Sequence, residues 1–256
     1  MLKVGIVGIS GRMGHALFEC CQGLDGVKVV CGIDRNTDSL PAGCSCEVVD
    51  APAKLGVIPD LFIDFTRPEC SLEGLAFAVK HKVRYVLGTT GFDEAGKEEI
   101  AKAARDIPVV FASNFSVGVN VILSLIEKTA AVMTDADIEI VEAHHRYKVD
   151  APSGTALSMG EAAARGRNVR LQDVMVAGRN GVTGERQYGT IGFSSIRGGD
   201  IVGMHNAMFC CDGERVEIAH HASSRATFAR GAIRAALWLA DKKEGLYTMS
   251  EVLGLN

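Results

Sequence analysis

The chain lacks the features of a membrane protein and of a disulfide-stapled one. Its apolar runs all stay shorter than the roughly 18 residues that a membrane-spanning helix needs. None of its eight cysteines forms a C-x-x-C pair, and their spacing does not match the usual zinc sites. With 256 residues, the chain is also too long for a small cysteine-stapled scaffold. We therefore expect reduced thiols, no bound metal and a soluble protein of the cytoplasm.

An excess of positive charge is absent as well. The sequence holds 27 lysines and arginines against 31 aspartates and glutamates, so its formal net charge is −4. Such a chain has no general attraction to nucleic acid or to an anionic membrane, and we expect neither as a partner. A small anionic substrate would need a local basic site. Repeats, low-complexity tracts and flexible linkers are also lacking, and the hydrophobic content of 47% is typical of a globular protein.

The first half of the sequence alternates between apolar strands and helices. Strands are predicted at residues 2–9, 27–34, 61–66, 84–91 and 108–116. Helices are predicted at residues 11–24, 68–82 and 94–105. Because the first strand runs directly into a glycine motif, we interpret the N-terminal residues as a strand and not as a signal peptide. Regular alternation of this kind indicates βαβ units around a parallel sheet.

The pattern changes after Asn114. Helices are predicted at 120–133, 155–164 and 227–239, a strand at 136–145, and four further extended segments between residues 174 and 222. Clustered strands of this kind favour a mostly open sheet with helices on one face. The sequence thus predicts an α/β protein in two parts, joined by short hinges.

A glycine motif, GISGRMG, follows the first predicted strand and opens the first helix. It places Gly8, Gly11 and Gly14 as in a dinucleotide-binding loop, where the backbone approaches a pyrophosphate at a helix N-terminus. Alone, the triplet fits an ordinary strand–helix turn equally well. Asp34 supports the nucleotide interpretation, because it ends the second strand at the place where an acid binds the adenosine ribose. Arg35 could meet a 2′-phosphate, so we expect tolerance of both NADH and NADPH.

Other residues could complete this nucleotide site. Arg12, within the loop, could reach a phosphate or could be an ordinary surface arginine. Two segments lie just past predicted strands, at the edge where open α/β sheets form ligand crevices; they are Gly88-Thr89-Thr90 and Ala112-Ser113-Asn114-Phe115. Either segment could instead be a simple turn.

The segment HHRYKVDAPSGTAL, residues 144–157, concentrates groups that bind anions and transfer protons. A single histidine is more often structural than catalytic, but here His144 and His145 are adjacent and Lys148 follows closely. On an extended strand the two histidines would point in opposite directions. Residues 153–155, Ser-Gly-Thr, then open a helix whose free N–H groups can hold a carboxylate. We expect Asp150 to cap that helix or to orient Lys148.

Together these motifs predict a reductase. A hydride would pass from the cofactor to a small carboxylate-bearing substrate, and a side chain of the 144–157 segment, placed opposite the nicotinamide, would supply a proton. Two alternatives stay open: a Rossmann oxidoreductase for another acid, such as an aspartate or amino-acid dehydrogenase, and a non-catalytic NAD(H) sensor. The first would not need the His-His-x-x-Lys and Ser-Gly-Thr pairing. The second tends to carry a DNA-binding helix pair or a basic patch, and the sequence shows neither.

The segment EAHHRYKVDAPSGTA (142–156) closely resembles the signature of the dihydrodipicolinate reductase family, now called 4-hydroxy-tetrahydrodipicolinate reductase, of lysine biosynthesis. Other segments resemble the family in the same order along essentially the whole chain: GISGRMG (8–14), DFTRPE (64–69), GTTGF (88–92), ASNFSVGVN (112–120), GTIGFSSIRGGDIVG (189–203) and ASSRATFARGA (222–232). The resemblance implies NAD(P)H-dependent reduction of 4-hydroxy-tetrahydrodipicolinate to tetrahydrodipicolinate, with loss of water, in the diaminopimelate route.

The resemblance also implies roles for individual residues. His144 corresponds to the acid/base histidine and Lys148 to the proton donor. The substrate-binding positions correspond to His145, Gly154 and Thr155. The cofactor positions correspond to Gly8, Ile9, Ser10, Gly11, Arg12, Met13, Asp34, Arg35, Gly88, Thr89, Thr90, Ala112, Ser113, Asn114 and Phe115, and Arg67 resembles an arginine near the cofactor in relatives.

The fold implied by the resemblance has two domains. Residues 1–116 and 226–256 would form a Rossmann-like dinucleotide-binding domain. Residues 117–225 would form an α+β domain that binds substrate and assembles a homotetramer through a mostly open sheet. Two departures from the family pattern bear on local sheet and loop structure: Met204 stands where glutamate is expected, and the segment at 161–171 is shorter than usual. His220 and His221 are expected to be structural.

Overall fold

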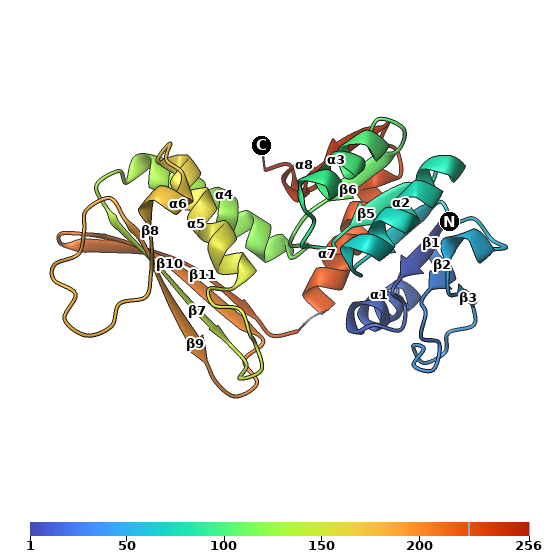
Figure 1. Ribbon diagram of the computed structural model, residues 1–256, viewed down its shortest axis with the longest axis horizontal. Helices are drawn as coiled ribbons and strands as arrows, with labels where there is room; N and C mark the ends of the chain where they lie inside the picture. Colours follow the sequence, from blue (N-terminus) through green and yellow to red (C-terminus); the bar gives the residue numbers. More distant parts are fainter. Residues whose placement is uncertain (225, 256) are drawn as a thin grey trace. The chain divides into compact units, whose positions relative to one another are not determined.

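The computed structural model describes residues 1–224 and 226–255 (Figure 1). Arg225, which falls inside the segment 222–232 and the predicted domain 117–225, and Asn256 lie outside the described residues. The chain forms two compact units: unit 1 combines Met1–Val117 with Arg225–Asn256, and unit 2 is Gly118–Ser224. Over the described residues, no helix is both long and apolar enough to span a membrane.

Unit 1 is built on a seven-stranded sheet with the strand order β12-β6-β5-β4-β1-β2-β3. The strands are β1 (Leu2–Val7), β2 (Val27–Ile33), β3 (Glu47–Val49), β4 (Leu61–Asp64), β5 (Arg84–Leu87), β6 (Pro108–Phe111) and β12 (Gly245–Tyr247). Every neighbouring pair is parallel. The order reverses between β1 and β4, and a ligand crevice is expected at the carboxyl ends of strands that meet at such a reversal.

Helices cover both faces of this sheet (Figure 1). One apolar core includes residues of α1 (Arg12–Gln22), α7 (Ala226–Leu239) and α8 (Met249–Leu253). The other includes residues of α2 (Pro68–His81) and α3 (Glu94–Ala103), and a short 3₁₀ turn, η1 (Pro52–Lys54), follows β3. Because α7 packs beside α1 although it follows unit 2 in the sequence, the C-terminal segment completes the core of unit 1.

Unit 2 holds a five-stranded sheet with the order β11-β10-β7-β9-β8. The strands are β7 (Asp137–His144), β8 (Met175–Ala177), β9 (Ile191–Arg197), β10 (Gly203–Cys211) and β11 (Glu214–Ala222). β10 runs antiparallel to β7 and β11, whereas β7, β9 and β8 are parallel. Figure 1 shows α4 (Val117–Val132), α5 (Gly154–Gly166) and the short α6 (Leu171–Val174) on one face, while no helix of the described residues covers the other.

Strand alternation decides which side chains of β7 face the helices. Ile138 and Ile140 are fully buried in the core of unit 2. With a period of two, Glu142 and His144 continue the same face. The parallel pairing of β7 with β9 then sets Arg197 beside His144. The apolar face of β7 therefore becomes polar where the segment 144–157 begins.

The predicted α/β fold class, with a Rossmann-like parallel sheet and a second, mostly open sheet, is confirmed. The short elements β3, β12, α6 and α8 were not expected from the sequence. They contain three to five residues each, which is too few to show a helical or strand periodicity. Their positions are set by contacts with longer elements, as in the pairing of β12 with β6.

Candidate active site

The glycine loop of unit 1 joins β1 to α1. Gly8 has a φ of +79°, a conformation that favours glycine, and the Gly11 N–H donates to the Gly8 carbonyl at 3.0 Å. A Cβ on Gly14 would lie 2.5 Å from the carbonyl oxygen of Ile9, so only glycine allows this close approach of helix and loop. Arg12 is the first residue of α1. The loop therefore has the shape that a pyrophosphate needs at a helix N-terminus.

Asp34 follows β2 directly and is tied to the glycine loop. Its Oδ2 accepts from the backbone N–H of Ser10 at 3.0 Å, and its Oδ1 accepts from that of Asn36 at 3.0 Å. A carboxylate oxygen has more than one lone pair, so Asp34 can accept ribose hydroxyls in addition. It stands where nucleotide-binding folds place their ribose acceptor.

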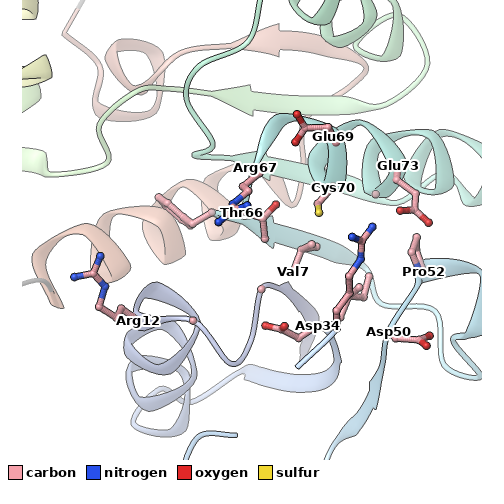
Figure 2. A pocket seen from close by; sticks show the side chains of 16 residues that line it. Val7, Arg12, Asp34, Asp50, Pro52, Thr66, Arg67, Glu69, Cys70 and Glu73 are labelled. Atoms are coloured by element: carbon pink, nitrogen blue, oxygen red, sulfur yellow. The ribbon is translucent and has the colours of Figure 1, made fainter. Parts of the chain in front are cut away.

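A cavity of about 840 Å³ opens along the ends of β1, β2 and β4 (Figure 2). Asp34 lies on one side of it, Thr66 and Arg67 from the β4–α2 connection lie on the other, and Arg12 lies at one end. Arg35 also lines the cavity. Three arginines and a glycine loop around this volume suit the phosphates and ribose of a dinucleotide. The residues present therefore fit NADH or NADPH.

Several predicted cofactor residues direct their side chains into the core. Ile9 and Phe115 are almost completely buried, and Met13 packs partly against the same core. The side-chain oxygen of Asn114 accepts from the backbone N–H of Ser116 at 2.8 Å, ahead of α4. These residues can meet a cofactor mainly through their backbone, whereas their side chains shape the loops.

The two predicted cofactor segments, residues 88–90 after β5 and residues 112–115 after β6, contain both buried and exposed residues. Thr89 is 2% exposed. A Cβ on Gly88 would overlap the ring of Phe65, so this position has no room for a side chain. Thr90 and Ser113 are exposed, and Ala112 is half-buried. The structure thus brings residues 8, 11, 12, 34 and 35 together around the cavity and places these two segments at the ends of β5 and β6.

A buried carboxylate lies beneath these loops. Asp64, the last residue of β4, is fully buried and accepts from Thr66 Oγ1 at 2.6 Å and from the Tyr85 hydroxyl at 2.8 Å. Burial raises the pKa of Asp64, although the hydrogen bonds oppose this change. The Ser71 hydroxyl donates to Thr89 Oγ1 at 2.8 Å. This network ties the connection after β4 to the connection after β5.

In unit 2, a buried ion cluster stands at the end of β7. Glu142 is 1% exposed, and its Oε2 lies 2.6 Å from His144 Nδ1. Arg197 of β9 donates to both oxygens of Glu142, at 2.8 and 2.7 Å. Burial alone would raise the pKa of Glu142, but hydrogen bonds from Arg197 and His144 outweigh it and lower the pKa to about 2. Glu142 is therefore ionised at neutral pH.

The two adjacent histidines belong to different local structures. β7 ends at His144, whose ring is largely buried beside Glu142. His145 lies in the turn that follows, where its carbonyl accepts from the Lys148 N–H at 3.1 Å and its ring lies 6.3 Å from that of Tyr147. The expectation that both histidines share one extended strand was wrong, because the strand ends between them.

Lys148 and Asp150 form an ion pair in the connection to α5. Lys148 Nζ donates to the two carboxylate oxygens at 2.7 and 2.9 Å, and this hydrogen bond lowers the pKa of Asp150. The contact fits the orienting role expected of Asp150, but the helix cap is Ser153, whose Oγ accepts a first-turn N–H at 3.2 Å. α5 starts at Gly154, so Gly154 and Thr155 belong to its first turn.

His205 of β10 completes the cluster from the neighbouring strand. It is 5% exposed, and its ring stands edge-on to that of His144 with the centroids 5.0 Å apart. Its Nε2 lies 3.0 Å from Ser153 Oγ. Burial, with a smaller contribution from the charge of His144, lowers the pKa of His205 to about 4. His205 is therefore neutral at physiological pH.

Sequence reasoning did not assign a role to Glu142, Arg197 or His205. Glu142 opens the segment EAHHRYKVDAPSGTA, two residues before His144, so a strand periodicity of two could have placed both on one face. Arg197 and His205 belong to other strands, and only the pairing of β7 with β9 and β10 brings them to this place.

Comparison with known families decides the identity. Residues 2–115 match the family described as dihydrodipicolinate reductase, N-terminus, and residues 118–253 match dihydrodipicolinate reductase, C-terminus. The chain belongs to the dihydrodipicolinate reductase family. Its activity is the NAD(P)H-dependent reduction of 4-hydroxy-tetrahydrodipicolinate to tetrahydrodipicolinate, with loss of water, in the diaminopimelate route to lysine. The family and activity predicted from the sequence are thereby confirmed.

Solved structures share the fold. Dipicolinate-bound dihydrodipicolinate reductase from Paenisporosarcina sp. TG-14 is 24% identical, with 98% of each chain covered and a TM-score of 0.81. An aspartate dehydrogenase from Thermotoga maritima is 13% identical, with 95% of this chain and 98% of that chain covered and a TM-score of 0.51. A myo-inositol dehydrogenase from Corynebacterium glutamicum is 14% identical, with 100% and 93% covered and a TM-score of 0.59. The reductase fold therefore also serves other substrates, so the fold alone does not select one.

Proposed function

We propose that unit 1 binds the cofactor of this reductase and that unit 2 binds the substrate and supplies the proton. The cofactor residues are those of the loop 8–13, Asp34 and Arg35, and the segments 88–90 and 112–115. In unit 2, His144 and Lys148 are the catalytic residues, and His145, Gly154 and Thr155 bind the substrate.

The start of α5 is the observation that carries this proposal. Ser153 caps the helix, and the first-turn N–H groups at Gly154 and Thr155 form an anion site of the kind found at helix N-termini. A chain with a net charge of −4 needs such a local site for a dicarboxylate. The Paenisporosarcina reductase was solved with dipicolinate, a cyclic dicarboxylate, bound to it. A substrate of the same class would place one carboxylate on this turn.

Lys148 and His144 are suited to proton transfer. The ammonium of Lys148 is held by the carboxylate of Asp150 at 2.7 Å, which fixes the position from which Lys148 donates a proton. His144 is hydrogen-bonded through Nδ1 and keeps Nε2 for the substrate. When bound, the nicotinamide cofactor supplies a hydride to the conjugated imine ring. A proton from Lys148, with His144 stabilising charge or relaying the proton, completes the product once water has been lost.

We further infer that the protein works as a homotetramer in the cytoplasm. One face of the unit 2 sheet is covered by no helix of the described residues. Ile196 and Met204 lie on this face and are 52% and 39% exposed. Apolar side chains on an uncovered sheet face favour contact with another copy. All eight cysteines are free, in keeping with a reducing compartment. Size-exclusion chromatography with light scattering tests the assembly, and a monomer at micromolar concentration would contradict it.

Steady-state kinetics of Lys148→Met, His144→Gln and the double variant test the catalytic assignment. Each single variant should lose kcat by about 10²–10⁴, with NADH affinity unchanged, because both groups act mainly in the transition state. The double variant should lose much less than the product of the single losses, since both residues serve one step. The assignment fails if either single variant keeps wild-type kcat, or loses activity only because NADH binds more weakly.

A further inference from the structure

Glu142 contacts both parts of the substrate site proposed above. Its Oε2 lies 2.6 Å from His144 Nδ1, and its Oε1 accepts from the backbone N–H of Ser153 at 3.2 Å. His144 is the proposed acid/base residue, and Ser153 caps the helix whose first turn is proposed to hold a substrate carboxylate. One buried carboxylate therefore joins the proton-transfer group to the anion-binding turn.

We propose that Glu142 is a positioning residue of the reductase, which fixes the orientation and tautomer of His144 and the start of α5 at the same time. The proposal rests on the proposed function, because it assumes that His144 and residues 154–155 act on the substrate. Glu142 is 1% exposed, so it acts through these neighbours and does not touch the substrate itself.

The carboxylate determines which nitrogen of His144 carries a hydrogen. An ionised carboxylate only accepts hydrogen bonds, so Nδ1 must be the donor in the 2.6 Å contact. Nε2 is then the nitrogen that gains or loses a proton. A Cβ at position 203 would lie 3.2 Å from Nε2, and the glycine found there avoids this crowding. Both features leave Nε2 as the working atom of the ring.

Arg197 holds the carboxylate in place and extends the cluster to the proton donor. Its two donors meet the two oxygens of Glu142 at 2.8 and 2.7 Å, a bidentate geometry that fixes the carboxylate plane. The same guanidinium donates to the carbonyl oxygen of Asp150 at 2.6 Å. Because Asp150 pairs with Lys148, the connection that carries the proposed proton donor is tied to Glu142 as well.

Charged and titratable groups face this cluster from every element packed against it. They are Glu142 and His144 on β7, Arg197 on β9, His205 on β10, His220 on β11, and Lys148 and Asp150 in the connection to α5. Glu142 is the carboxylate in direct contact with the His144 ring. Removing this carboxylate would leave both the His144 ring and Arg197 without the acceptor that they contact.

Glu139 on the same strand offers a matched control. It lies three residues away, on the opposite face of β7, and pairs with Arg179 and Arg186 at 2.9 Å each. Burial opposes its ionisation, but hydrogen bonds from these arginines outweigh it and lower the pKa of Glu139, as Arg197 does for Glu142. Both arginine partners of Glu139 lie outside the proposed site.

The test compares Glu142→Gln with Glu139→Gln in the full-length protein with enzymatically generated substrate. Glu142→Gln should lower kcat on the order of 10–100-fold, as when a reacting group is displaced slightly, and should raise the substrate KM, with NADH affinity unchanged. Glu139→Gln should match the wild type. Equal kinetics for the two variants would overturn the proposal.

The double variant Glu142→Gln/His144→Gln separates positioning from a general loss of structure. If Glu142 acts largely through His144, the double variant should lose much less kcat than the product of the two single losses, and losses that multiply would overturn the proposal. If Glu142→Gln does not fold, Glu142→Asp replaces it, because this variant keeps the charge but shortens its reach. A folded Glu142→Asp with wild-type kinetics would also overturn the proposal. Full activity of His144→Gln would instead refute the proposed function, which keeps the two failures distinct.

Discussion

His205 should make the stability of unit 2 fall as the pH drops below neutrality. Burial lowers its pKa from 6.5 to about 4, so between these values the unfolded chain binds a proton that the folded chain does not. Stability is therefore lost as the pH falls through this interval. Each pH unit in this interval lowers the free energy of unfolding by about 1.4 kcal/mol, so the whole interval corresponds to about 3 kcal/mol. About 2.5 kcal/mol of this free energy should be lost between pH 7 and pH 4.5. The pKa of Glu142 is about 2, so the stability that this carboxylate contributes is lost mainly below this pH range.

Urea unfolding followed by circular dichroism, at several pH values from 7 to 4.5, measures this effect. His205→Gln and His205→Phe both remove the titrating ring, so both should lose this part of the pH dependence. At pH 7 the two variants should differ by about 1–2 kcal/mol, because phenylalanine leaves the Ser153 hydroxyl without its partner at 3.0 Å. A wild-type pH slope in both variants would refute the conclusion that His205 is held neutral by burial.

Two further substitutions test the binding residues. Arg35→Ala should weaken NADPH binding by about 1–3 kcal/mol and leave NADH binding nearly unchanged, because the guanidinium lining the cavity can pair with the extra phosphate. Fluorescence titrations measure both affinities. Equal losses for the two cofactors would show that Arg35 does not contact that phosphate. Thr155→Val keeps the shape of the side chain but removes its hydroxyl, so the substrate KM should rise while cofactor affinity holds. An unchanged KM would remove this turn from the anion site.

Much of unit 1 could be predicted because each buried strand leaves a continuous apolar run. β4 and β5, for example, are short stretches that are buried almost throughout, and the sequence shows both clearly. β3 and β12 could not be predicted, since three residues carry no pattern of their own. They form because the neighbouring strands β2 and β6 offer backbone groups to pair with.

The site could be predicted only where its residues are consecutive. His144 and Lys148 fall in one short segment, whereas Arg197 and His205 reach the same place through strand pairing that the sequence does not display. Thr89 shows a different limit. Its position after β5 suggested a cofactor contact, but its hydroxyl is bound within the buried Asp64 network. A pattern of residue types does not reveal whether a hydroxyl points outward or inward.

The most direct measurement is cofactor oxidation by the purified protein, followed at the nicotinamide absorbance. NADH or NADPH should be oxidised when enzymatically generated 4-hydroxy-tetrahydrodipicolinate is present. Oxaloacetate with ammonia, offered in its place as the reaction mixture of an aspartate dehydrogenase, should give no oxidation. Lys148→Met should bind NADH with wild-type affinity yet oxidise it about 10²–10⁴ times more slowly. Oxidation with oxaloacetate and ammonia but not with the cyclic dicarboxylate would contradict the reductase activity, and a fully active Lys148→Met would contradict the site assigned to it.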